Sequence, residues 1–248
     1  MQARVWEKFL TDDDKEHIRL RHDRRVGVGT TPALLLIDLY RAVFGDKPEP
    51  LIESIRTWPS SCGMAGWNAL PHIQKLLAAA RAAKIPVIHV TMLSGSAITS
   101  WSEAAHRDQP KKIPDAAAAE RKLRGPEIVE EVAPIAGEAV IRKTAPSAFW
   151  GTPLAGHLNY LGVDTVFIAG ESTSGCVRAS VVDAVAYRYR VQVVEECVFD
   201  RHETTHALNL FDMHQKYADV ISIYTALSYL SRFNDNRLRG GIRCPSDY

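Results

Sequence analysis

The sequence predicts a three-layer α/β/α fold, Rossmann-like, with a mostly parallel sheet of six strands. Short apolar runs rich in Val and Ile, without polar alternation, are typical of strands buried on both faces. Helical patterns separate most of these runs, and helix alternating with strand over short links indicates a parallel sheet covered by helices. The runs are residues 33–38, 87–91, 139–143, 165–170, 191–197 and 219–223.

The segments between the expected strands follow from the same patterns. Helices are predicted over residues 67–84, 115–125, 151–162, 174–190 and 203–218. Residues 41–66 and 92–114 are loop-like, rich in Pro, Ser and Gly, and we expect them to form lids over a site. This gives an N-terminal helical extension over residues 1–25, one α/β domain over 26–230 and a C-terminal tail over 231–248.

Composition narrows the classes of partner. The chain has 248 residues, with 30 basic and 29 acidic side chains, so a net charge of +1 gives no basis for binding nucleic acid or an anionic membrane. We find neither a secretory signal nor an apolar run approaching the roughly 20 residues of a membrane helix. We therefore expect a cytoplasmic protein with reduced thiols, which permits a catalytic cysteine among Cys62, Cys176, Cys197 and Cys244.

Three reactive side chains are expected where ligands bind in such sheets, beyond the carboxyl ends of the strands. Asp38 and Lys143 end two apolar runs, and Cys176 opens the helix that follows a third. A thiol at a helix N-terminus is favoured as the thiolate. The pattern predicts a Cys nucleophile, an Asp that moves its proton, and a Lys that stabilises both anions. Backbone N–H groups of "STSGC" are expected to hold an oxyanion.

The segments "LLLID", "RKTAPSAFWGTPL" and "GESTSGCVRASVVDA" resemble the isochorismatase-like cysteine hydrolases, in the branch of the N-carbamoylsarcosine and maleamate amidases. The resemblance spans roughly residues 30–225. It implies the catalytic residues Asp38, Lys143 and Cys176, a cis peptide at Glu171–Ser172 and oxyanion donors at the N–H groups of Ser172 and Cys176. It also implies no cofactor, a homo-oligomer (a tetramer by preference) and release of ammonia from a small amide or carbamoyl compound through a thioester.

Further residues are assigned to substrate binding. By the resemblance, Arg201 in "FDRHE" grips a substrate carboxylate; the alternative is a surface Arg paired with Asp200. Glu171 departs from the small or apolar residue usual in the family, and either faces the substrate or points away from it. The other pocket candidates, for whose aromatic members core packing is the alternative, are Phe44, Ser147, Phe149, Trp150, Thr173 and His202. Arg178 is expected to tie its helix to a neighbour or subunit.

The segment "HETTHALNLFD" allows a different function, because His-Glu-x-x-His on a helix is the pattern of a zinc metallopeptidase. Its residues would be His202, Glu203 and His206, with Asp212 as a third ligand. A helix that continues through Asp212 carries it roughly 15 Å from His202, too far for a shared metal, so we predict no metal site. A non-catalytic interaction module and hydrolysis of an isochorismate-like vinyl ether are further alternatives; the intact Asp38, Lys143 and Cys176 argue against both.

Overall fold

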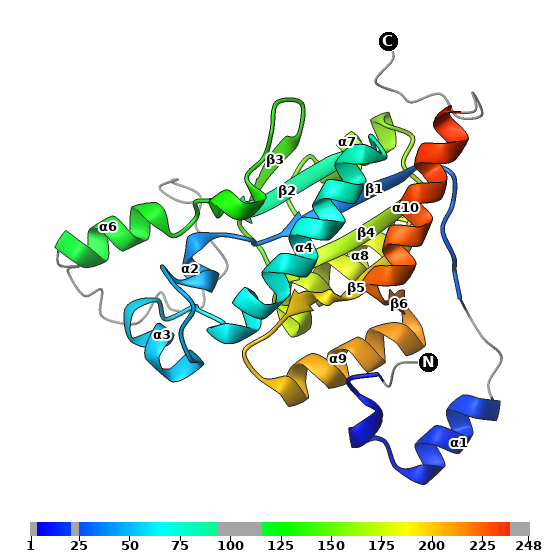
Figure 1. The fold of residues 1–248 in the computed structure, drawn as a ribbon, viewed down its shortest axis with the longest axis horizontal. Coiled ribbons are helices and arrows are strands. Elements are labelled where there is room, and N and C mark those ends of the chain that lie inside the picture. The colour runs from blue at the N-terminus through cyan, green and yellow to red at the C-terminus, as the bar shows by residue number, and fades with distance from the viewer. Residues whose placement is uncertain (1–3, 21–24, 94–115, 239–248) are drawn as a thin grey trace.

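The computed structural model of the protein describes residues 4–20, 25–93 and 116–238. Six parallel strands form one sheet in the order β3-β2-β1-β4-β5-β6 (Figure 1). Their bounds are Pro32–Ile37 (β1), Val87–Met92 (β2), Ala139–Lys143 (β3), Thr165–Glu171 (β4), Arg190–Phe199 (β5) and Asp219–Ile221 (β6). Each coincides with a predicted run to within a few residues, and the predicted α/β class with a parallel six-stranded sheet is confirmed.

Helices cover both faces of the sheet (Figure 1). The buried side chains form two cores. On one face α4 (Met64–Ala82) and α10 (Ile223–Leu238) pack over Leu34, Leu36 and Phe167. The other core contains side chains of α7 (Leu154–Tyr160), α8 (Arg178–Ala186) and α9 (Glu203–Lys216). The central strands β1 and β4 are buried at every position, which explains why their sequences are continuously apolar.

The topology creates one edge where reactive groups can meet. From β1 the chain builds outward through β2 to β3, then crosses back to β4 on the other side of β1 and continues to β6. The strand order therefore changes direction between β1 and β4, and a crevice forms beyond their carboxyl ends at such a point.

The loop prediction for residues 41–66 was wrong. This segment contains α2 (Arg41–Phe44), α3 (Leu51–Thr57) and the start of α4. Such short helices between prolines leave little periodicity to detect. The lid prediction for 92–114 falls almost entirely outside the described residues. The predicted helix at 115–125 is α6 (Ala116–Arg124), and α10 runs past the expected start of the tail, to Leu238.

The N-terminal extension is more closely joined to the domain than its polar sequence indicates. It contains a short 3-10 turn (Glu7–Phe9) and helix α1 (Asp12–Leu20), which has no buried residue. Ahead of both, Trp6 is only 4% exposed and lies against Phe211 and His214 of α9. Arg4 pairs with Glu195 of β5. Within the described residues, no helix combines the length and the apolar character needed to cross a membrane.

Candidate active site

Three side chains from three strand ends meet at the carboxyl edge of the sheet. The Lys143 ammonium lies 2.8 Å from Asp38 Oδ2 and 3.1 Å from Cys176 Sγ. It also donates to the carbonyl of Ala145 at 3.2 Å. Asp38 is fully buried, Lys143 is 6% exposed and Cys176 is half-buried. The fold thus brings together the Asp, Lys and Cys that the sequence singled out, with the Lys between the other two; we name them the Asp38–Lys143–Cys176 cluster.

The backbone fixes Asp38 at the end of β1. Its N–H donates to the carbonyl of Val90 at 2.9 Å, and its φ of 56° lies in the left-handed region that few residues other than Gly adopt. Beside it, Gly170 of β4 has a φ of 123°, and a Cβ there would lie 1.9 Å from the carbonyl oxygen of Ile37. Close approach of β1 and β4 beneath the cluster therefore requires glycine at 170.

A tight turn, Thr173–Val177, presents the Cys176 thiol before α8 begins. Gly175 departs from helical geometry inside this turn, and a Cβ on it would lie 2.4 Å from the Ser172 hydroxyl. Asp200, at the end of β5, clamps the turn by accepting hydrogen bonds from the N–H (2.9 Å) and hydroxyl (2.7 Å) of Ser174. Ser180 anchors the other side by donating to the Cys176 carbonyl at 2.7 Å.

Burial dominates the electrostatics of the cluster. It raises the pKa of Cys176 to about 12, with Asp38 adding to the effect and Lys143 opposing it. Burial also raises the pKa of Asp38, against the pull of Lys143. At Lys143 burial lowers the pKa, but Asp38 and Cys176 outweigh it and the pKa is raised. The position of Cys176 at a helix N-terminus favours the thiolate, but burial outweighs this effect. Cys176 is a thiol next to a carboxylate of increased basicity.

The backbone that leads into the Cys176 turn has two distinctive features. The Glu171–Ser172 peptide is cis, as the resemblance implies. Among the described residues no acceptor is seen for the Ser172 N–H, while the Ser172 carbonyl accepts from Gly175 and Val177 at 3.0 and 3.1 Å. An unpaired N–H at the start of the turn that presents the thiol is a donor available to an oxyanion.

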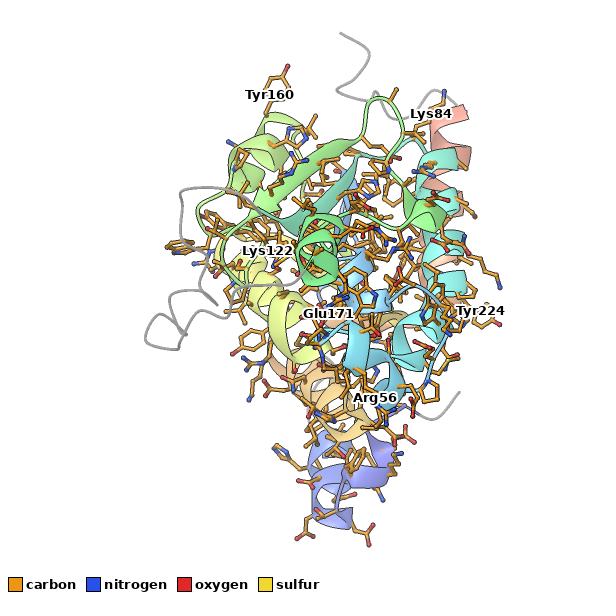
Figure 2. All side chains as sticks on the ribbon, turned by 90° about the vertical axis from the view of Figure 1, so that its left-hand side faces the viewer. Arg56, Lys84, Lys122, Tyr160, Glu171 and Tyr224 are labelled. Carbon is orange, nitrogen blue, oxygen red and sulfur yellow. The ribbon has the colours of Figure 1, made fainter. Side chains whose placement is uncertain are left out.

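Glu171 and Arg201 form an ion pair next to the cluster. Arg201 NH1 lies 2.9 Å from Glu171 Oε1, and NH2 donates to the carbonyl of Ser60 in the loop between α3 and α4. Glu171 is 5% exposed and lies near the middle of the molecule, whereas Tyr160 and Tyr224 lie at its margins (Figure 2). The alternative that Arg201 is a surface residue paired with Asp200 was wrong: its side chain pairs with Glu171, and Asp200 accepts a hydrogen bond from the Arg201 backbone N–H at 2.8 Å.

Several aromatic pocket candidates pack elsewhere. The Phe44 ring is fully buried between Trp67 and Phe199. Phe149 is 3% exposed and stacks on Tyr187 of the segment after α8. Core packing, the alternative for aromatics, therefore describes these two rings.

The other two pocket candidates after β3, Trp150 and Ser147, are not among the hydrogen-bond or ion-pair partners of Lys143. The Trp150 side chain is 66% exposed and belongs to neither core. Ser147 is buried, and its hydroxyl accepts a hydrogen bond from the Phe149 N–H at 3.1 Å, which shapes the turn after β3.

The residues of "HETTH" have separate partners. His202 is exposed, and Glu203 pairs with Lys8 of the N-terminal extension. His206 Nδ1 lies 2.8 Å from the hydroxyl of Thr173, so both of these side chains are occupied. Asp212 pairs with Arg178 at 3.0 Å, which ties α8 to α9 as expected for Arg178. Within the described ranges, no three His, Cys, Asp or Glu side chains gather as metal ligands.

Sequence reasoning missed Tyr40 as a neighbour of the site. Tyr40 is 8% exposed, and burial together with the charges of Asp38 and Glu171 raises its pKa. The sequence feature that could have identified Tyr40 is its position two residues after Asp38. Cys62 lies with its Sγ 3.7 Å from Glu171 Oε1, and burial raises the pKa of its thiol.

A groove of about 1140 Å³ lies beside this site, lined by the N-terminal residues, α4, β5, α9 and β6. Asp200, Arg201 and His206 contribute to its wall, but Asp38, Lys143 and Cys176 do not. This groove therefore includes Asp200, Arg201 and His206 and does not include the Asp38–Lys143–Cys176 cluster.

Comparison with known proteins agrees with this geometry. Residues 32–224 match the isochorismatase domain family. The chain is 37% identical to maleamate amidohydrolase of Pseudomonas putida, over 84% of this chain and 90% of that relative. It is 33% identical to N-carbamoylsarcosine amidase of an Arthrobacter species, over 84% of this chain and 74% of that relative. A solved isochorismatase family protein of Desulfovibrio vulgaris superposes with a TM-score of 0.64 at 27% identity, covering 82% of this chain and all of that one. This chain belongs to the isochorismatase family.

Proposed function

We propose that the protein is a cysteine amidohydrolase that releases ammonia from a small amide or N-carbamoyl compound. The observation that supports this most strongly is the position of Lys143 within 2.8 Å of Asp38 and 3.1 Å of Cys176. A thiol, a buried base and a cation in mutual contact are the groups that nucleophilic acyl transfer requires. Membership of the isochorismatase family and the two amidohydrolase relatives add support.

In the first half-reaction Asp38 accepts the proton of the Cys176 thiol as sulfur attacks the carbonyl carbon. Lys143 stabilises the negative charge while it moves between the two groups. The oxygen of the tetrahedral intermediate is held by the N–H groups of Ser172 and Cys176. The C–N bond then breaks, and Asp38 returns its proton to the leaving nitrogen, which departs as ammonia.

In the second half-reaction a water molecule attacks the thioester. Asp38 takes a proton from this water, the C–S bond breaks, and the proton returns to the sulfur. The acid is released and Cys176 is again a thiol. The high pKa of the thiol fits this cycle, because sulfur remains protonated until Asp38 acts and becomes a strong nucleophile when it is deprotonated.

The named relatives carry out such reactions on maleamate and on N-carbamoylsarcosine, each an amide-type compound with one carboxylate. We propose the same substrate class here, with Arg201 as the group that binds the carboxylate. N-carbamoylsarcosine and maleamate are the first candidates. A homo-oligomer, with a tetramer favoured, remains a prediction that sedimentation velocity can check.

Ammonia release from a panel of compounds tests the proposal: N-carbamoylsarcosine, other N-carbamoyl amino acids, maleamate, nicotinamide and biuret. Cys176→Ala is compared with Cys197→Ala, a matched control because Cys197 is fully buried in the core beneath α4 and α10. We expect at least one compound to be hydrolysed, with turnover lost in Cys176→Ala and retained in Cys197→Ala. Full turnover by Cys176→Ala would refute the nucleophile, and inactivity against every amide would favour a non-catalytic module.

A further inference from the structure

The Glu171–Arg201 pair is not a bidentate salt bridge. Two nitrogens of the Arg201 guanidinium go to two different acceptors: NH1 to Glu171 and NH2 to the Ser60 carbonyl. Within the described residues, Oε1 is the Glu171 oxygen that accepts from Arg201, and this same oxygen lies 3.7 Å from Cys62 Sγ. A ligand carboxylate that faces the guanidinium can accept two parallel N–H···O hydrogen bonds. This bidentate arrangement is stronger than a single hydrogen bond. Glu171 therefore holds Arg201 more weakly than a well-oriented ligand carboxylate would.

The register of the sheet fixes this pair at the site. Glu171 lies opposite Phe199 in the β4–β5 ladder, so Arg201, two residues beyond Phe199, extends over the end of β4. Glu171 immediately precedes Ser172, whose N–H is the proposed oxyanion donor, and Arg201 is 29% exposed in its side chain. The ion pair thus lies beside the residue that carries the proposed oxyanion donor, and its partly exposed guanidinium is open to a ligand, whereas Glu171 is buried.

Charges around Glu171 are unfavourable for a second anion. Among the described residues it faces Arg201 and Asp200 after β5, Asp38 after β1, the Tyr40 hydroxyl and the Cys62 thiol. With Lys143 included, three carboxylates are opposed by two cations. An anionic substrate therefore enters a site that already has an excess of one negative charge, unless one carboxylate takes up a proton.

Glu171 is the carboxylate that can take up this proton. Asp38 is reserved as the base, and Asp200 accepts three hydrogen bonds from the N–H and hydroxyl of Ser174 and the N–H of Arg201. Burial raises the pKa of Glu171 to about 7, with Arg201 opposing and Asp38 adding to the effect. A substrate carboxylate that draws Arg201 away removes the interaction that favours the ionised form.

We propose, on the basis of the function above, that Glu171 is a positioning residue that controls substrate charge: it holds Arg201 in the free enzyme and yields it to the substrate carboxylate, taking up one proton from solvent. No covalent bond changes in this step. The proton returns to solvent when the product leaves and Arg201 pairs with Glu171 again.

The proposal predicts a dependence of KM on pH that a structural salt bridge does not produce. Above the pKa of Glu171, binding of an anionic amide requires a proton, so KM rises with pH, with a limiting slope of about tenfold per unit. Below that pKa, KM is constant. The kcat is unaffected, and a neutral amide such as nicotinamide, if hydrolysed, shows no such rise in KM.

The variant Glu171→Gln tests this because it retains the shape and one hydrogen bond to Arg201 without the charge. We expect a KM for the anionic substrate that is severalfold lower at pH 8 and flat between pH 6.5 and 8.5, with kcat within about twofold of the parent. The matched control is Glu138→Gln, since Glu138 also pairs with an arginine, Arg81, at 2.7 Å, but precedes β3 at the end opposite Lys143. The control should keep the rise of KM with pH. Equal pH profiles for parent and Glu171→Gln would overturn the proposal.

A binding measurement separates this inference from the proposed reaction. Maleate is titrated by calorimetry into Cys176→Ala protein at pH 8 in two buffers of different ionisation enthalpy, with and without Glu171→Gln. We expect uptake of about one proton with Glu171 and none with Gln. Equal proton uptake in both proteins, or failure of both to bind maleate, would overturn the inference. Proton uptake without ammonia release from any amide would refute the proposed function and leave this inference standing.

Discussion

At the scale of single residues, the chemistry depends on Lys143. Its ammonium contacts both the carboxylate of Asp38 and the sulfur of Cys176, in a site where each of these groups is removed from most of the water. In such surroundings the cation stabilises whichever neighbour is negatively charged. Moving one proton from sulfur to Asp38 therefore leaves one anion beside Lys143 before and after the transfer, which keeps its free-energy cost small.

Removing this cation alone should destabilise the protein. Lys143→Met leaves Asp38 fully buried without its ion-pair partner, which typically costs about 3–5 kcal/mol in the free energy of unfolding. The double variant Lys143→Met with Asp38→Asn should regain much of that loss, because no uncompensated charge remains. Denaturant unfolding of the three proteins measures both effects. Equal destabilisation in the single and double variants would show that the ion pair contributes little to stability.

The base should be visible in the pH dependence of the reaction. Asp38 accepts a proton only when it is ionised, so kcat/KM rises as pH increases through the pKa that governs it. Burial raises that pKa, hence the acid limb should lie above the ordinary value of 3.8. Because Asp38, Lys143 and Cys176 interact, the measured midpoint belongs to the cluster. A limb at or below 3.8 would contradict the assignment of the base.

At the scale of helices and strands, the sequence predicts the strands well and the side-chain partners poorly. Buried strands leave long apolar runs, and the carboxyl ends of parallel strands share an edge, so Asp38, Lys143 and Cys176 could be placed together before the fold was known. The pairing of Glu171 with Arg201 depends on the β4–β5 register, which shifts between Ile168 and Gly170. No local pattern encodes such a shift.

The aromatic residues illustrate the same limit. Adjacent in sequence, Phe149 is buried against Tyr187, and Trp150 is exposed. Which of two neighbouring side chains turns inward depends on a turn fixed by Ser147 and Ser180, which belong to different segments. In "HETTH" the periodicity correctly predicts a continuous helix. The partner of Glu203 is Lys8 and the partner of His206 is Thr173, and both come from segments far away in sequence.

One contact between elements should stabilise the fold in a pH-dependent way. Although burial disfavours its charge, bonds from Arg81, the Ile135 N–H and His89 lower the pKa of Glu138 to about 2. The ionised group therefore contributes stability above its ordinary pKa of 4.5, and that contribution is lost as pH falls from 4.5 toward 2. Glu138→Gln should lower the free energy of unfolding by about 1–3 kcal/mol at pH 7. Urea unfolding should show this difference shrinking below pH 4.5, and a constant difference would contradict the account.

At the scale of the whole molecule, the two cores and the N-terminal segment form one unit. The core on the side of α7, α8 and α9 is completed by Trp6, which comes from outside the family-matched region 32–224. Arg4 reinforces the contact by bonding Glu195 and the Val220 carbonyl of β6. The N-terminal segment is thus joined to α9 and to the strands β5 and β6.

Loss of this contact should reduce stability without reducing activity. Trp6→Ala removes a large buried ring and should lower the free energy of unfolding by about 3–5 kcal/mol. Turnover per folded molecule should stay within about twofold, because Trp6 contacts α9 and none of the Asp38–Lys143–Cys176 cluster. Unfolding in urea and active-site titration test the two parts. A loss below about 1 kcal/mol, or a large loss of turnover, would contradict this view of the segment.

The central claim is that Cys176 becomes covalently bonded to the substrate, and mass spectrometry tests it most directly. A hydrolysed amide is mixed with the protein, the reaction is stopped with acid during turnover, and the peptide containing Cys176 is analysed. The account predicts an added mass equal to the substrate minus ammonia on Cys176, absent from Cys176→Ala. Turnover at the full rate by the Cys176→Ala protein, which forms no adduct, would contradict the account. An adduct on Cys62 or Cys197 in place of Cys176 would contradict it as well.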